Sequence, residues 1–180
     1  MDAALRAFSE DGPYVTLEAI ARNAGVGIGT LYRHFPTRDA LVEATYRNEL
    51  TRLCETAGQL LQALPPDEAM RTWMDHFIDC VTARRGMADA LRALTASGGR
   101  TYAQSPERLA AAITTLLDAG SAAGTLRPDA APADVLTGLS GIALAAGEPD
   151  QRDQAGRVLD LLMDGLRLPA AGPAAPDGRS

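Results

Sequence analysis

Lysine is absent from this sequence of 180 residues, so all 17 of its fixed positive charges are arginines. They are outnumbered by 23 acidic residues, and the net charge of -6 excludes a protein whose whole surface is basic enough to coat nucleic acid. The net charge does not exclude a local basic surface. The segment from Ala19 to Arg38 contains Arg22, Arg33 and Arg38 and no acidic residue, which predicts such a surface there.

Aromatic residues are also scarce, at 4% of the chain, whereas hydrophobic residues make up 46%. The core must therefore consist mainly of alanine, leucine, valine and methionine, a composition that favours helices over sheets. The two cysteines, Cys54 and Cys80, are far apart and form no CxxC pair, which indicates free thiols in a reducing compartment. No segment has the pattern of a signal peptide or a membrane span, so we expect a cytoplasmic protein.

Residue groups that could perform catalysis or bind a metal are missing as well. His76 and Cys80 are four residues apart and could share a helix face, but two candidate ligands do not make a metal site. The glycine-rich run Gly25–Gly29 lacks the preceding strand that a nucleotide-binding loop needs. The sequence has no cluster from which a nucleophile and its base could be built. We therefore expect no enzyme, no cofactor and no metal.

Apolar residues recur at spacings of three and four along most of the chain, which is the period of an amphipathic helix. The clearest case is one long helix over Asp39–Leu64, which ends at a pair of prolines. Further helices follow it, separated by breaks that contain glycine and proline. The sequence predicts an all-α protein of about nine helices, with a disordered tail at residues 169–180.

Residues 16–38 have the pattern of a helix, a tight turn and a second helix. Thr16 precedes the first helix as an N-cap, and Gly25 stands in the turn, where a positive φ is cheap only for glycine. The expected buried face consists of Ile20, Ala21, Val26, Leu31 and Phe35. The expected exposed face of the second helix consists of Ile28, Gly29, Thr30, Tyr32, Arg33 and His34. This surface carries no carboxylate, and an α-helix fits the major groove of B-DNA.

This segment resembles the DNA-binding domain of the TetR (tetracycline-repressor) family. The matching residues are Thr16, Ile20-Ala21, Ala24-Gly25-Val26, the run from Gly29 to Arg38, and Ala40-Leu41. The resemblance implies a three-helix helix-turn-helix domain over residues 1–45 and a helical effector-binding and dimerisation domain over residues 46–168. It also implies a homodimer that binds a near-palindromic DNA operator and responds to a small-molecule effector, usually as a repressor.

The resemblance also implies roles for particular residues. Gly27, Ile28, Gly29 and Thr30 would lie in the major groove, and Tyr32 and Arg33 would reach bases or phosphates. His34 would bind a phosphate, while Thr16 and Arg22 would contact the DNA backbone beside the groove. Arg38 occupies the position of a common phosphate-binding lysine. The predicted DNA-binding set is thus Thr16, Arg22, Gly27, Ile28, Gly29, Thr30, Tyr32, Arg33, His34 and Arg38.

Two further sets are predicted in residues 46–168. Apolar side chains of the middle helices form either a filled core or an effector cavity, and the resemblance favours a cavity for an apolar or aromatic ligand with one polar group. They are Trp73, Met74, Phe77, Met87, Leu91, Leu94, Tyr102, Ile113 and Leu117. The resemblance implies that the last two helices form a four-helix interface with a second copy. The residues predicted there are Leu136, Leu139, Ala143, Ala146, Val158 and Leu162.

An alternative function stays open at this point. Gly27, Ile28 and Gly29 are poor direct readers of bases, so DNA shape and flanking contacts would carry much of the specificity. A helical dimer that binds a ligand or a protein and has lost DNA binding has the same overall pattern. A DNA-binding protein must expose Tyr32, Arg33 and His34 and must bind DNA with an affinity that falls with salt.

Overall fold

The computed structural model describes residues 2–10, 15–82, 105–146 and 151–168, which form eight α-helices. The helices are α1 (Asp2–Glu10), α2 (Leu17–Asn23), α3 (Ile28–His34), α4 (Arg38–Ala63), α5 (Pro66–Thr82), α7 (Ser105–Ala122), α8 (Pro132–Ala145) and α9 (Arg152–Leu166). Within these residues there is no sheet, only an isolated bridge between Leu126 and Arg167. The all-α prediction is confirmed. Residues 83–104 and the tail predicted at residues 169–180 lie outside the described residues.

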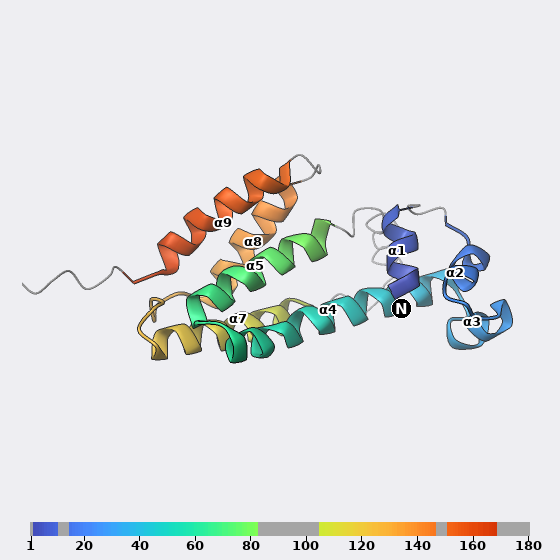
Figure 1. Cartoon of the computed structure of the whole chain (residues 1–180), viewed down its shortest axis with the longest axis horizontal. Coiled ribbons are helices and arrows are strands. Elements are labelled where there is room, and N and C mark those ends of the chain that lie inside the picture. The colour runs from blue at the N-terminus through green and yellow to red at the C-terminus, as the bar shows by residue number, and fades with distance from the viewer. Residues whose placement is uncertain (1, 11–14, 83–104, 147–150, 169–180) are drawn as a thin grey trace, which may run out of the picture.

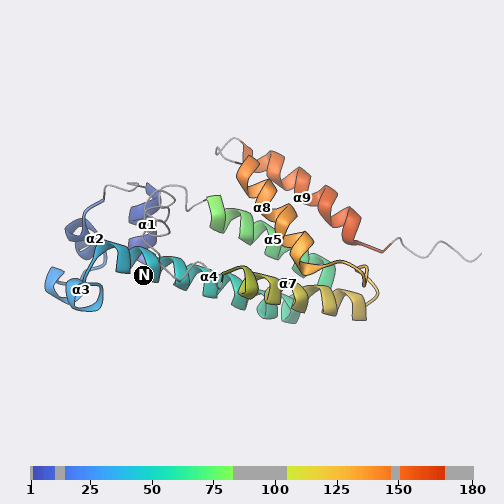
Figure 2. The same cartoon turned by 180° about the vertical axis from the view of Figure 1, so that it is seen from behind.

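The 26-residue helix α4 runs along most of the molecule. At a rise of 1.5 Å per residue it is about 39 Å long. Figure 1 shows α1, α2 and α3 gathered around its beginning and α5 and α7 beside its later turns. The view from behind in Figure 2 shows the same arrangement, with α8 and α9 on the far side of α5 from α4. One helix therefore belongs to both parts of the molecule.

Two hydrophobic cores lie along α4. The N-terminal core joins α1, α2 and α3 to the first half of α4, and it includes Phe8, Ile20, Leu31 and Leu41. The C-terminal core joins the second half of α4 to α5, α7, α8 and α9. Cys54 and Leu109 pack against both cores, so the boundary between them crosses the middle of α4 and the start of α7.

Helix α5 is the centre of the C-terminal core. It packs against α4, α7, α8 and α9, and its side chains Met70, Trp73, Met74 and Ile78 are fully buried. The indole Nε1–H of Trp73 donates to the backbone oxygen of Leu53 on α4 at 2.9 Å. A buried indole needs such a partner, and this bond ties α5 to the helix that carries the N-terminal domain.

Ion pairs join the outer side of α5 to α9. Arg71 on α5 reaches Asp160 on α9 at 2.8 Å and also pairs with Asp75. Arg152 on α9 reaches Asp75 at 2.8 Å and Asp79 at 2.7 Å. These groups are partly exposed, so each pair adds little stability, but together they hold α9 in one orientation on α5.

The link between α7 and α8 is fastened to the end of α9. The backbone N–H of Arg127 donates to the oxygen of Leu166 at 2.8 Å, and that of Leu168 donates to the oxygen of Thr125 at 3.1 Å. The neighbouring Leu126 is fully buried against Gly120, where a Cβ would lie 2.4 Å from a Leu126 methyl carbon. Only glycine leaves room for this close approach.

Candidate nucleic-acid interface

The first helix of the helix-turn-helix forms as the sequence predicts. The hydroxyl of Thr16 accepts from the backbone N–H of Ala19 at 3.2 Å, which confirms the predicted N-cap. Ile20 and Ala21 are buried in the N-terminal core, also as predicted. Arg22 follows them on the exposed side of α2. Helix α2 therefore has its apolar face inward and its arginine in solvent.

The turn between α2 and α3 depends on one glycine. Gly25 has φ +67, a value that L side chains rarely adopt, and this confirms the reason predicted for glycine there. The backbone N–H of Val26 then bonds back to the oxygen of Ala21 at 3.0 Å. The prediction that Val26 is buried was wrong, because its side chain is 41% exposed. The turn directs it away from the small core beneath α3.

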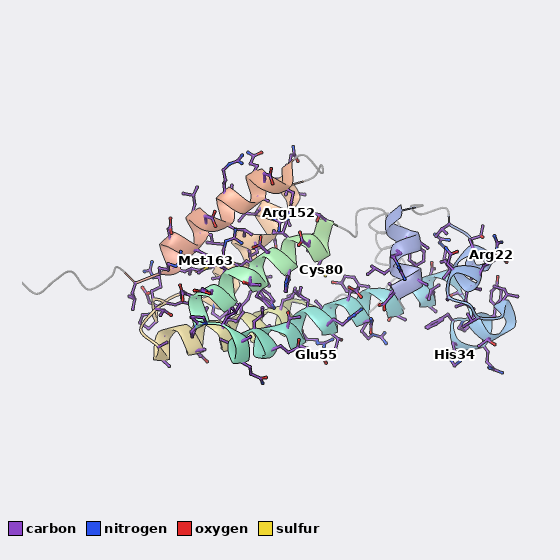
Figure 3. The ribbon with its side chains drawn as sticks, in the orientation of Figure 1. Arg22, His34, Glu55, Cys80, Arg152 and Met163 are labelled. Atoms are coloured by element: carbon purple, nitrogen blue, oxygen red, sulfur yellow. The ribbon has the colours of Figure 1, made fainter. Side chains whose placement is uncertain are left out.

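Helix α3 presents nearly all of its side chains to solvent. Leu31 is its one buried residue, and Phe35, which follows it, is half-buried against the N-terminal core. Its exposed residues are Ile28, Gly29, Thr30, Tyr32, Arg33 and His34. Figure 3 shows Arg22 and His34 at the same end of the molecule, away from α9. The outward position of Tyr32, Arg33 and His34, which DNA binding requires, is present.

The electrostatics of this end favour a polyanion. No acidic side chain occurs between Glu18 and Asp39, whereas Arg22 and Arg33 are both exposed. The hydroxyl of Thr37 accepts from the N–H of Ala40 at 3.1 Å, which begins α4 next to this surface. A basic surface without nearby acidic residues in the sequence therefore lies at this end of the described residues, in a protein whose net charge is -6.

Arg38 has contacts within the protein that the sequence did not predict, and its role at a phosphate stays a prediction. It is half-buried, and its guanidinium donates to the backbone oxygen of Val15 and lies 5.2 Å from the ring centroid of Phe8. These contacts tie the start of α4 to α1 and to the beginning of α2. The sequence carried no signal for them, because the partners are 23 and 30 residues away.

The described part of the predicted effector cavity consists of buried apolar side chains. Trp73, Met74 and Phe77 on α5 are buried against Ile113 and Leu117 on α7. The polar atom of Trp73 is already bonded to α4, so the indole offers no polar group to a ligand. The other predicted residues, Met87, Leu91, Leu94 and Tyr102, lie outside the described residues.

The predicted dimer residues are of two kinds. Leu139, Ala143 and Ala146 are buried in the protomer's own core, so they support a surface from behind rather than form it. Leu136 and Leu162 are half-buried, and Val158 is 39% exposed.

Sequence reasoning missed the two most exposed apolar side chains of this region. Leu144 on α8 is 81% exposed and Leu161 on α9 is 71% exposed. The signal for Leu161 was a second apolar stripe, since it falls one turn after Val158 on the same face of α9. Leu144 had no such signal, because α8 is apolar on most sides.

The described residues contain no group of three or more side chains that could hold a metal. Among the same residues no helix has the length and hydrophobicity to cross a membrane. Burial against α7 raises the pKa of the Cys54 thiol, despite the nearby charge of Arg108, which acts in the opposite direction.

These features define a helix-turn-helix protein with a helical C-terminal domain, and comparisons with known proteins identify its family. A model described as "Bacterial regulatory proteins, tetR family" matches residues 1–45. A model described as "Transcriptional regulator SbtR-like, C-terminal domain" matches residues 65–168. The chain belongs to the TetR family of bacterial transcriptional regulators, and its N-terminal helices are a helix-turn-helix DNA-binding domain.

Solved structures agree over almost the whole chain. A TetR transcriptional regulator from Streptomyces coelicolor is 56% identical, with a TM-score of 0.87, over 94% of this chain and 97% of that one. A TetR transcription regulatory protein from Mycobacterium vanbaalenii is 32% identical, with a TM-score of 0.74, over 93% and 92%.

Among curated proteins the likeness covers part of the chain. The HTH-type transcriptional regulator BetI of Escherichia coli is 38% identical over 72 residues, which is 39% of this chain. The match spans only 37% of the length of that relative.

Proposed function

We propose that the protein is a ligand-responsive repressor that acts in the cytoplasm as a homodimer on a near-palindromic DNA operator. The observation that carries this proposal is the exposed face of α3, which has tyrosine, arginine and histidine side chains and no carboxylate beside them. DNA phosphates attract such a surface, and the groups on it can bond to phosphates and base edges. One helix of seven residues is too short to give specific affinity alone, so two copies are needed.

The surface that fits a second copy lies on α8 and α9. Leu144 and Leu161 are large, apolar and mostly exposed, and Val158 is one turn from Leu161. Gly141 and Gly165 have open space around them, so the helices of a partner could approach closely there. In a symmetric dimer both copies of each of these side chains would be buried in the interface.

The proposed response to an effector uses the contacts of α5. A ligand that enters the apolar region around Phe77 would displace α5. Helix α4 would move with it, because the hydrogen bond of Trp73 joins these two helices. Since α4 carries α3, such a displacement changes the separation of the two recognition helices. The ligand releases DNA only if it binds more tightly to the conformation that cannot span both half-sites.

The test of DNA binding starts with selection of bound genomic fragments by the full-length protein. Fluorescence anisotropy on the selected fragment should show an affinity that falls steeply with salt. The double variant Tyr32→Ala, Arg33→Ala should lose most of the affinity, whereas Arg127→Ala, which removes an exposed arginine beside α8, should not. Affinity unchanged in the double variant, or an intact dimer that binds no DNA, contradicts the proposal and favours a helical module without DNA binding.

The effector is tested separately. Trp73 is the single tryptophan of the chain and is buried in the region proposed to respond. Apolar and aromatic compounds with one polar group should be screened for a change in its fluorescence. A true effector also lowers operator affinity, and a compound that changes the fluorescence but leaves DNA binding unchanged is not an effector.

A further inference from the structure

The surface of α3 is unusual in being apolar as well as basic. Three large apolar side chains in the span 26–32 are exposed, namely Val26 at 41%, Ile28 at 38% and Tyr32 at 45%. The other large exposed apolar side chains of the described residues are on α8, on α9 and just after α9. Ile28 and Tyr32 are four residues apart and therefore share one face of α3. A protein leaves such a surface uncovered at some cost, which indicates a binding partner.

The side chains on this stretch limit what it can recognise. Residues 24–31 read Ala-Gly-Val-Gly-Ile-Gly-Thr-Leu, without Arg, Lys, Asn, Gln, Asp or Glu. Those missing residues supply the paired hydrogen bonds that distinguish guanine, adenine and cytosine in the major groove. The exposed groups that remain are the methyl groups of Ile28 and Val26 and the small side chain of Thr30. The one apolar group that bases offer in the major groove is the C5 methyl of thymine.

The glycines beside Ile28 permit a close approach to DNA. Gly27 and Gly29 are exposed, and a Cβ built on Gly29 would meet nothing within 4 Å of the protein. Packing inside the protein therefore does not require glycine at position 29. Without a side chain there, the backbone of α3 can come nearer to the base edges. The short side chain of Ile28 is then long enough to contact a base.

We propose that Ile28 reads the C5 methyl group of thymine, so that the operator carries a thymine at the base step facing this side chain in each half-site. This proposal rests on the proposed operator binding and names the chemistry by which the same surface selects its sequence. Arg33 and His34 supply affinity through phosphates, and Ile28 supplies discrimination. At this base step the sequence preference then comes from van der Waals contact and not from hydrogen bonds.

The test uses the full-length dimer and an operator selected from genomic fragments. Each thymine of the half-site is replaced in turn by deoxyuridine, which removes the C5 methyl and keeps every hydrogen-bonding group. At the thymine facing Ile28 we expect affinity to fall about fourfold per half-site, the factor for one apolar carbon group returned to water. An operator without thymine facing α3, or one that is insensitive to every replacement, overturns the proposal.

Protein variants assign the effect to Ile28. Ile28→Ala should bind the thymine operator more weakly and should bind the thymine and deoxyuridine operators equally. Val26→Ala removes a similarly exposed apolar side chain two residues away and should keep the deoxyuridine effect. If Ile28→Ala keeps the effect, or Val26→Ala abolishes it, Ile28 is not the reader. Thermal unfolding of each variant checks that the fold is retained.

Gly29→Ala tests the close approach independently. Alanine fits the protein at this position and favours the helix, so the variant should unfold at the same temperature or higher. Its affinity for the operator should fall at least tenfold, because the added methyl holds α3 away from the bases. Unchanged affinity would overturn the close approach. A wild-type protein with no salt-sensitive affinity for any DNA would refute the proposed function itself, a result distinct from binding that ignores the thymine methyl.

Discussion

Replacing Leu161 by glutamate is the sharpest test of how two copies assemble. Its side chain is 71% exposed on α9, so the protomer gains little from it. Fully burying a leucine contributes about 1.5–3 kcal/mol, and the exposed part therefore offers roughly 1–2 kcal/mol to a partner. In a two-fold symmetric dimer each protomer buries its own Leu161, so the contribution of this residue to the dimer doubles to about 2–4 kcal/mol.

The expected result is a weaker dimer with an intact protomer. A loss of about 2–4 kcal/mol raises the dimer dissociation constant by a factor of roughly 30 to 1000. Two carboxylates brought into an apolar interface increase the factor further. The thermal unfolding of the monomer should hardly change. Operator affinity should fall with the dimer, since one recognition helix alone binds weakly.

The assay is sedimentation velocity over a concentration series, with Leu161→Glu and the double variant Leu144→Glu, Leu161→Glu beside the wild type. Ala111→Glu adds the same charge at an exposed position of α7 and serves as the matched control. The control should remain dimeric. If both glutamate variants assemble as tightly as the wild type, the face carrying Leu144 and Leu161 is not the interface, and the reasoning from exposed apolar surface is refuted.

Three further predictions concern the folded protomer. Gly120→Ala should lower the free energy of unfolding by about 1–3 kcal/mol, because the added Cβ would overlap Leu126. Gly58→Ala adds the same methyl group in open space on α4 and should not lower it. Urea unfolding measures both variants. Arg38→Met should lower the free energy of unfolding by about 2–3 kcal/mol, because the contacts with the Val15 carbonyl and the Phe8 ring are lost. The slope of log operator affinity against log salt concentration should stay unchanged. A slope reduced in magnitude by about 0.9 per half-site would instead reveal a phosphate contact. Trp73→Phe should cost about 2–3 kcal/mol by removing the hydrogen bond to the α4 backbone and leaving a void, and calorimetry showing no loss would contradict that role.

Much of the DNA-binding domain followed from local chemistry. Thr16 and Thr37 cap their helices and Gly25 makes the turn because caps and turns depend on a few neighbouring residues. The outward face of Tyr32 and Arg33 followed from helical spacing. Val26 did not, because it stands in the turn, where no helical period defines a face.

The C-terminal helices were harder, for a physical reason. Helix α8 is apolar on most sides, so its sequence does not distinguish the side that meets its own core from the side that meets a partner. Leu139 turned out to be internal and Leu144 external. Spacings of three and four identify residues that share a helix face, but not what covers that face.

The amino-acid sequence alone established an all-helical protein with a carboxylate-free recognition helix, because helix formation, capping and charge are properties of nearby residues. Only the tertiary structure decided that Arg38 would donate to the Val15 carbonyl and lie over the Phe8 ring. It also decided that the Trp73 indole would donate to the backbone of α4. It also decided which leucines of α8 and α9 remain in solvent. These outcomes join residues far apart along the chain, and distant contacts depend on how the helices pack together rather than on any local pattern.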